Sequence, residues 1–142
     1  MCTQELQCHT FATTLRRPFV VCNYTKNDAV VLIGGTNSLH YERECGNIQS
    51  LIQDLILKLQ HTNIILTSIP YRYDQPEWNK TILNINKQIY DIVLENRDVS
   101  FIPINNLLTR SNSTHHGLHM NKIGKDILCT AVALHVTFKV NM

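Results

Sequence analysis

Three runs of apolar residues without polar alternation stand out along the chain. Residues 29–33 read Ala-Val-Val-Leu-Ile, residues 63–68 read Asn-Ile-Ile-Leu-Thr-Ser, and residues 99–104 read Val-Ser-Phe-Ile-Pro-Ile. A short continuous apolar run is typical of a strand that is covered on both faces, as in a parallel sheet. We therefore expect three parallel strands with helices on both sides.

Between and after these strands, apolar residues recur at helical spacing. The first predicted helix follows Gly46, and its apolar face is Ile48, Leu51, Ile52, Leu55, Ile56 and Leu59. The second enters at Asp74, Pro76 and Glu77, and its apolar face is Trp78, Ile82, Ile85, Ile89, Ile92 and Val93. A last helix is expected over residues 121–136. Because these crossovers suit parallel strands only, the pattern predicts a three-layer α/β/α sandwich.

Composition agrees with one domain in residues 28–142, after a segment of little pattern in residues 1–27. The chain has 142 residues, 44% hydrophobic and 17% charged, which is enough for one core. A net charge of +2 is too small to indicate binding to nucleic acid or to a membrane. No apolar run is long enough to span a bilayer, and the first residues lack the pattern of a signal peptide.

The cysteines and the glycosylation patterns bear on the compartment. Five cysteines are an odd number, and their spacing is not that of a metal site, so we expect reduced thiols. Asn23, Asn79 and Asn112 begin Asn-x-Ser/Thr patterns, which we attribute to chance in the absence of a secretory signal. These observations predict a cytoplasmic protein, and no motif indicates a cofactor.

The first candidate site follows the first predicted strand. Gly34, Gly35, Thr36, Asn37 and Ser38 come directly after it. Two glycines allow a sharp turn and a close approach to a ligand, and the Asn37 amide would then stand where open α/β sheets bind their ligands. Taken alone, the same residues are equally consistent with a plain turn.

A second stretch near the other end of the chain favours the site over the plain turn. Residues 115–125 read His-His-Gly-Leu-His-Met-Asn-Lys-Ile-Gly-Lys. Together the two stretches resemble blocks of the SGNH hydrolases, the GDSL-type esterases and lipases, over about residues 28–128. The resemblance implies that Asn37 is the oxyanion donor and His119 is the base of the catalytic triad. It also implies a flavodoxin-like sheet of order 2-1-3-4-5, with the predicted strands as the third to the fifth.

The chain departs from the family pattern at several positions. His116 stands where the triad aspartate is expected, and Ser38 replaces the aspartate that usually follows the oxyanion asparagine. The nucleophile block, Gly-Asp-Ser, does not occur, and no glycine precedes Gly34. The chain therefore resembles an SGNH domain without its nucleophilic strand. His116 can hydrogen-bond to His119 but brings no negative charge, so it is a poor substitute for a carboxylate.

Several serines and a metal site are alternative sources of chemistry. Ser38 lies on the expected rim but directly follows the oxyanion residue, Ser68 is no better placed, and Ser111 and Ser113 lie in a loop, where nucleophiles are held imprecisely. The three histidines of residues 115–119 have spacing that can bind zinc, but Gly117 argues against a regular helix there. No Cys or Asp lies close by in the sequence to complete the ligand set.

The predicted strand at residues 29–33 raises a question of its own. Without a preceding strand it has an open apolar edge, which favours aggregation. We expect this edge to pair with residues 19–22 or with a second copy of the chain in a homodimer.

Two functional hypotheses remain. The chain is either an enzyme that hydrolyses small acyl or acetyl esters with an unconventional nucleophile, or a non-catalytic binding or relic domain. SGNH-like domains also occur in proteins of some retrotransposons, and a truncated copy would resemble this sequence. Because the Gly-Asp-Ser block is missing, we favour a non-catalytic domain that retains a pocket for a small ester or acyl ligand.

Overall fold

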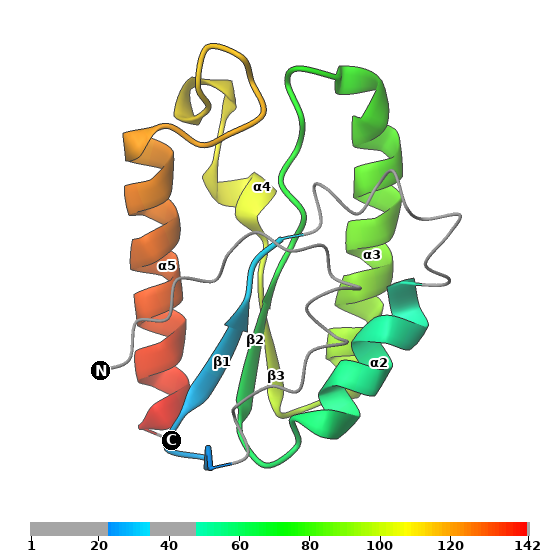
Figure 1. Ribbon diagram of the computed structural model, residues 1–142, viewed down its shortest axis with the longest axis vertical. Helices are drawn as coiled ribbons and strands as arrows, with labels where there is room; N and C mark the ends of the chain where they lie inside the picture. Colours follow the sequence, from blue (N-terminus) through cyan, green and yellow to red (C-terminus); the bar gives the residue numbers. More distant parts are fainter. Residues whose placement is uncertain (1–22, 35–47, 142) are drawn as a thin grey trace.

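The computed structural model describes residues 23–34 and 48–141. These residues form an α/β unit in which strands and helices alternate along the chain (Figure 1). The strands are β1 (Ala29–Leu32), β2 (Asn63–Thr67) and β3 (Val99–Ile102). The α-helices are α2 (Ile48–Lys58), α3 (Asn79–Glu95), α4 (Ile104–Leu107) and α5 (Lys122–Val140), and two 3₁₀ turns are η2 (Pro76–Trp78) and η3 (Arg110–Asn112).

The three strands form a parallel sheet of order β1-β2-β3. Val30 pairs with Ile64, and Ile64 pairs in turn with Val99. All residues of the central strand β2 are buried, as expected for a continuous apolar run. The predicted parallel sheet with helices on both sides is confirmed for the described residues.

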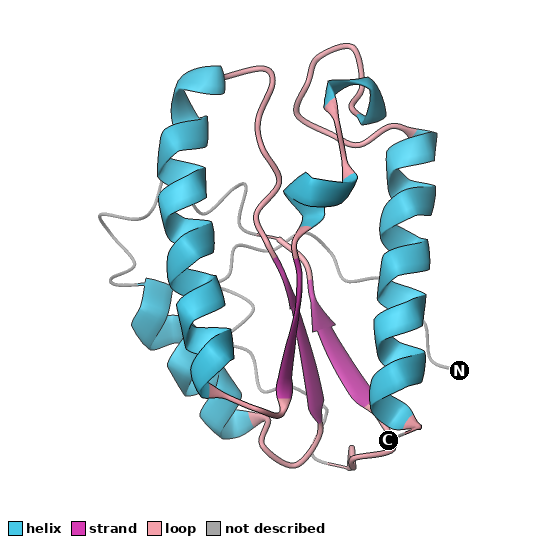
Figure 2. Ribbon diagram, turned by 180° about the vertical axis from the view of Figure 1, so that it is seen from behind, coloured by secondary structure: helices cyan, strands magenta, loops and turns pink. Residues whose placement is uncertain are grey.

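Each face of the sheet carries a separate apolar cluster, because successive side chains of a strand point to opposite faces. On one face, Leu32, Ile64 and Leu66 pack with residues of α2 and α3. On the other face, Ile65 and Ile102 pack with residues of α4 and α5. The two views show α2 and α3 on one side of the sheet and α5 on the other (Figures 1 and 2). The described residues thus form a helical layer on each side of the sheet.

The third strand ends earlier than its apolar pattern predicts. β3 stops at Ile102, and Ile104 already begins α4. Pro103 has no N–H for the sheet, and the N–H of Ile104 donates to Ser68 Oγ at 2.8 Å instead of continuing the ladder. The predicted strand over residues 99–104 was therefore two residues too long.

The second helix also begins later than its entry signal predicts, and the last helix runs further. Pro76 opens the 3₁₀ turn η2, and α3 begins only at Asn79. At the other end of the chain, α5 continues to Val140 rather than ending near residue 136. Residues 125–142 contain no glycine or proline that could end the helix near residue 136.

The outer edge of β1 has no partner strand among the described residues. Within residues 23–34 and 48–141, β1 pairs with β2 alone. Residues 19–22, the predicted partner, lie outside the described residues, so this pairing and the homodimer stay predictions. Among the helices described, none combines the length and the apolar character needed to cross a membrane.

Candidate functional site

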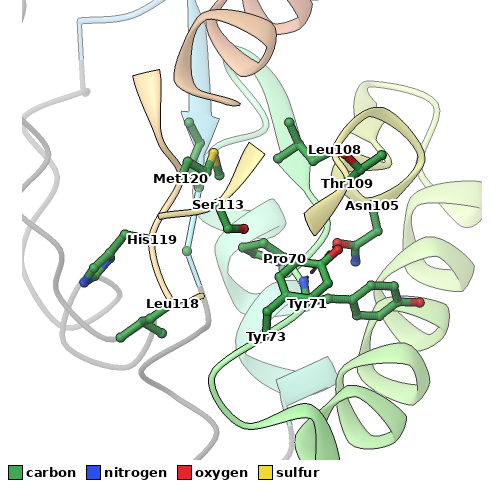
Figure 3. A pocket seen from close by; sticks show the side chains of 12 residues that line it. Pro70, Tyr71, Tyr73, Asn105, Leu108, Thr109, Ser113, Leu118, His119 and Met120 are labelled. Atoms are coloured by element: carbon green, nitrogen blue, oxygen red, sulfur yellow. Dashed lines mark hydrogen bonds between the residues drawn. The ribbon is translucent and has the colours of Figure 1, made fainter. Parts of the chain in front are cut away.

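A pocket of about 160 Å³ lies at the carboxyl ends of the strands (Figure 3). Gly34 lines it from the end of β1, Pro70 and Tyr71 from the loop after β2, Asn105 from α4 after β3, and His119 from the loop before α5. These residues are distant in the sequence and meet because parallel strands place their carboxyl ends at one edge of the sheet.

Two asparagine side chains hold the loop after β2 in place. Asn86 of α3 accepts from the Ile69 N–H at 2.7 Å and donates to the Ile69 carbonyl at 2.9 Å. Asn105 of α4 accepts from the Tyr71 N–H at 2.9 Å and donates to the same Ile69 carbonyl at 2.9 Å. Since buried backbone groups without partners are costly, these bonds fix one wall of the pocket.

The next part of the loop is held by Asn79 and by an ion pair. Asn79 accepts from the Arg72 N–H at 2.7 Å and donates to the Arg72 carbonyl at 2.8 Å. The buried Arg72 guanidinium donates twice to the Asp74 carboxylate, at 2.6 and 3.1 Å. These hydrogen bonds lower the pKa of Asp74 and raise the pKa of Arg72. Both charges are therefore engaged with each other rather than with the pocket.

Gly117 allows the histidine loop to pack tightly against the loop after β2. The Tyr73 N–H donates to the Gly117 carbonyl at 2.9 Å. Gly117 has φ +81°, and a Cβ there would lie 2.8 Å from the Asp74 nitrogen. A side chain is excluded by both the backbone angle and the space. The glycine of the second motif thus has a packing role.

Arg110 holds the histidine loop from the other side. Its guanidinium donates to the carbonyls of Thr114 and His115, each at 3.0 Å. It also lies 5.5 Å from the centre of the Tyr73 ring, within the range of a cation–π contact.

The remaining motif residues form the start of α5. Asn121 is the N-cap, and its side chain accepts from the Gly124 N–H at 2.9 Å. The same amide donates to the Ser111 carbonyl at 2.7 Å. Gly124 is buried directly against the Asn112 carbonyl, where a Cβ would collide. Asn121 and Gly124 therefore have structural roles at the start of α5, and these roles do not depend on the role of His119.

His119 lines the pocket, but its ring points away from Asn105 and Tyr73 (Figure 3). The reason is a short antiparallel bridge between Ser113 and Met120, in which the Thr114 N–H donates to the His119 carbonyl at 2.8 Å. Paired residues of an antiparallel bridge share one face, and their neighbours take the other. His119 is exposed, on the face opposite Ser113.

The described contacts do not link His116 to His119. His116 is exposed, and its ring lies edge-on to that of His115 at 5.8 Å. No hydrogen bond joins it to His119 among the residues that the structure describes. Those residues also contain no group of three or more His, Cys, Asp or Glu side chains that could hold a metal.

The serines differ in what they can do. Ser68 is 3% exposed, and its Oγ accepts from the N–H of Ile104 at the start of α4, so it is a structural residue. Ser111 pairs with Thr109 at 2.8 Å on the surface. Ser113 directs its hydroxyl into the pocket (Figure 3), away from the face of His119. Neither Ser68 nor Ser113 is arranged to pass a proton to this histidine.

The first motif is described only at Gly34, which lines the pocket. Gly35, Thr36, Asn37 and Ser38 lie outside the described residues. The predicted meeting of Asn37 with His119 on one rim therefore stays a prediction, as do the roles of Asn37 and Ser38.

Sequence reasoning missed Asn86 and Asn105, the two residues that fix the pocket wall. A signal was present for Asn86, since this polar residue falls within the apolar stripe Ile82, Ile85, Ile89 and Ile92 of α3. A polar side chain on a buried helical face has to find partners. Asn105 carried no comparable signal, because its role depends on where β3 ends.

Comparisons of the chain with models of known protein families, with curated protein sequences and with solved structures found no match.

Proposed function

We propose that this chain is an SGNH-type esterase-like domain that binds a small ester or acyl ligand without hydrolysing it by the serine mechanism. The observation that carries the proposal is that Gly34 and His119, which belong to two separate motifs, line one pocket at the carboxyl edge of the sheet. A flavodoxin-like arrangement of the family's last three strands is consistent with the order β1-β2-β3.

The contacts of His119 support a binding role over a catalytic one. A triad needs a serine that donates to the histidine and a carboxylate that orients it. Among the described residues, no hydrogen bond joins the His119 ring to Ser113 or His116, and the His116 ring lies against that of His115. Asp74 is engaged with Arg72. The described part of the chain therefore supplies a pocket, and no proton path from serine to carboxylate.

Turnover of 4-nitrophenyl acetate tests this proposal. We expect the purified protein to hydrolyse the ester no faster than its His119→Ala variant, within about twofold, because His119 lacks the serine and the carboxylate that make a histidine a triad base. His61→Ala is a matched control, since it removes an exposed histidine that does not line the pocket. Saturable turnover that falls by about a hundredfold or more in His119→Ala alone would mean that the domain is an esterase after all.

A further inference from the structure

We infer that the pocket selects a compact, uncharged ligand group with one hydrogen-bonding end, such as the neutral ester or amide of a small acid, over the corresponding carboxylate. This inference deepens the proposed function and rests on it, since it names the class of ligand for the same pocket. It is carried by the size, the charge and the hydrogen-bonding groups of the pocket.

The size of the pocket limits the ligand group. Its volume is about 160 Å³, close to that of an apolar cavity of about 150 Å³ that holds benzene in another protein. Pro70, Leu108, Leu118 and Met120 contribute apolar walls. A ring or a short branched acyl group fits this space, whereas a long acyl chain would extend beyond it.

The charge of the lining disfavours an anion. None of the lining side chains that the structure describes is a lysine, arginine, aspartate or glutamate. The two arginines next to lining residues in the sequence are already engaged, Arg72 with Asp74 and Arg110 with the carbonyls of Thr114 and His115. A carboxylate among these described side chains would lose water without gaining a lysine or arginine as a counter-ion, which is costly.

Ser113 supplies one hydrogen-bonding group of the pocket. Its bonds within the described residues use the backbone, from its N–H to the Arg110 carbonyl and from Asn121 to its own carbonyl. The hydroxyl itself points into the pocket (Figure 3). By contrast, the Asn105 amide is occupied by Tyr71 and Ile69. A hydroxyl can donate to a carbonyl oxygen or accept from an amide, so an uncharged ester or amide suits it.

Benzamide and benzoate form a matched pair of probes, because they share a ring and a similar shape and differ in charge. Two-dimensional amide NMR of the full chain gives both the affinity and the location of each probe, and phenyl acetate serves as an ester probe. We expect benzamide and phenyl acetate to shift the amides of Gly34, Tyr71 and Met120. Benzoate should bind at least about tenfold more weakly.

Three variants test whether benzamide binds in this pocket. Ser113→Ala should weaken benzamide binding by roughly three- to tenfold, the value of one hydrogen bond, and it is too small a change to disturb the fold. Ser113→Phe should abolish the shifts by filling the pocket. Ser111→Phe, two residues away and outside the lining, should leave them unchanged.

The outcomes separate the inference from the proposed function. Benzoate binding as tightly as benzamide, or benzamide binding equally well to Ser113→Ala, would overturn the inferred ligand class and leave a ligand-binding pocket in place. If neither benzamide, benzoate nor phenyl acetate shifts these amides, both the ligand class and the proposed binding function are wrong.

Discussion

Asn86 and the backbone of Ile69 form a closed pair of hydrogen bonds, 2.7 Å from the Ile69 N–H to Asn86 Oδ1 and 2.9 Å from Asn86 Nδ2 to the Ile69 carbonyl. Ile69 is fully buried just beyond the end of β2, where the chain leaves the sheet. The asparagine thus replaces the ladder partners that the strand no longer has, and it sets the direction of the loop that becomes the pocket wall.

Asn86→Ala should lower the free energy of unfolding by about 1–3 kcal/mol, because it leaves the buried Ile69 N–H unpaired, while the Ile69 carbonyl keeps its bond from Asn105. Urea denaturation followed by circular dichroism measures the change. Asn84→Ala on the same helix is the matched control, since Asn84 is exposed, and it should change stability by at most about 0.5 kcal/mol. Equal effects of the two substitutions would show that the paired bonds to Ile69 contribute nothing to stability.

The Arg72–Asp74 pair should make stability depend on pH in the acid range. The Arg72 hydrogen bonds lower the pKa of Asp74, so the pair stabilises the fold above the unfolded-state pKa of about 3.9. This contribution is lost as the pH falls through the lower folded-state pKa. Asp74→Asn should cost about 1–2 kcal/mol at pH 7 and reduce the loss of stability between pH 5 and pH 2.

Denaturation curves at several pH values measure this dependence. Asp126→Asn is the control, because Asp126 faces Lys122 at 3.7 Å on the surface with its side chain 68% exposed. Surface pairs of this kind contribute little, so its pH profile should match that of the unaltered chain. A pH profile of Asp74→Asn identical to that of the unaltered chain would contradict the role given to the pair.

The strands and helices were predictable because their patterns are local and continuous. The apolar run around Ile64 and Ile65 specifies a strand buried on both faces, and the spacing from Ile82 to Ile92 specifies a helix. The boundaries were less predictable because they depend on distant partners. β3 ends at Ile102 because Pro103 has no N–H for the sheet and the N–H of Ile104 donates to Ser68, which directly follows β2.

A pocket at this edge of the sheet agrees with the residue patterns, whereas the site roles given to the motif residues stay predictions. The motif around residues 115–125 does lead to the pocket edge, and His119 does line the pocket. However, Gly117 and Asn121 have packing and capping roles that would produce the same motif without any catalysis. The bridge between Ser113 and Met120 sets the face on which His119 lies. No residue pattern in the sequence predicted this bridge.

Labelling with a fluorophosphonate, read by intact mass, tests the central claim most directly, because this reagent reports a serine activated by a neighbouring base. We predict no labelling of the purified chain, and none in His119→Ala or Ser38→Ala. Stoichiometric labelling that disappears in both variants would contradict the account and identify Ser38 as a nucleophile served by His119. Labelling that is lost with His119 but kept in Ser38→Ala would contradict it equally and point to another serine.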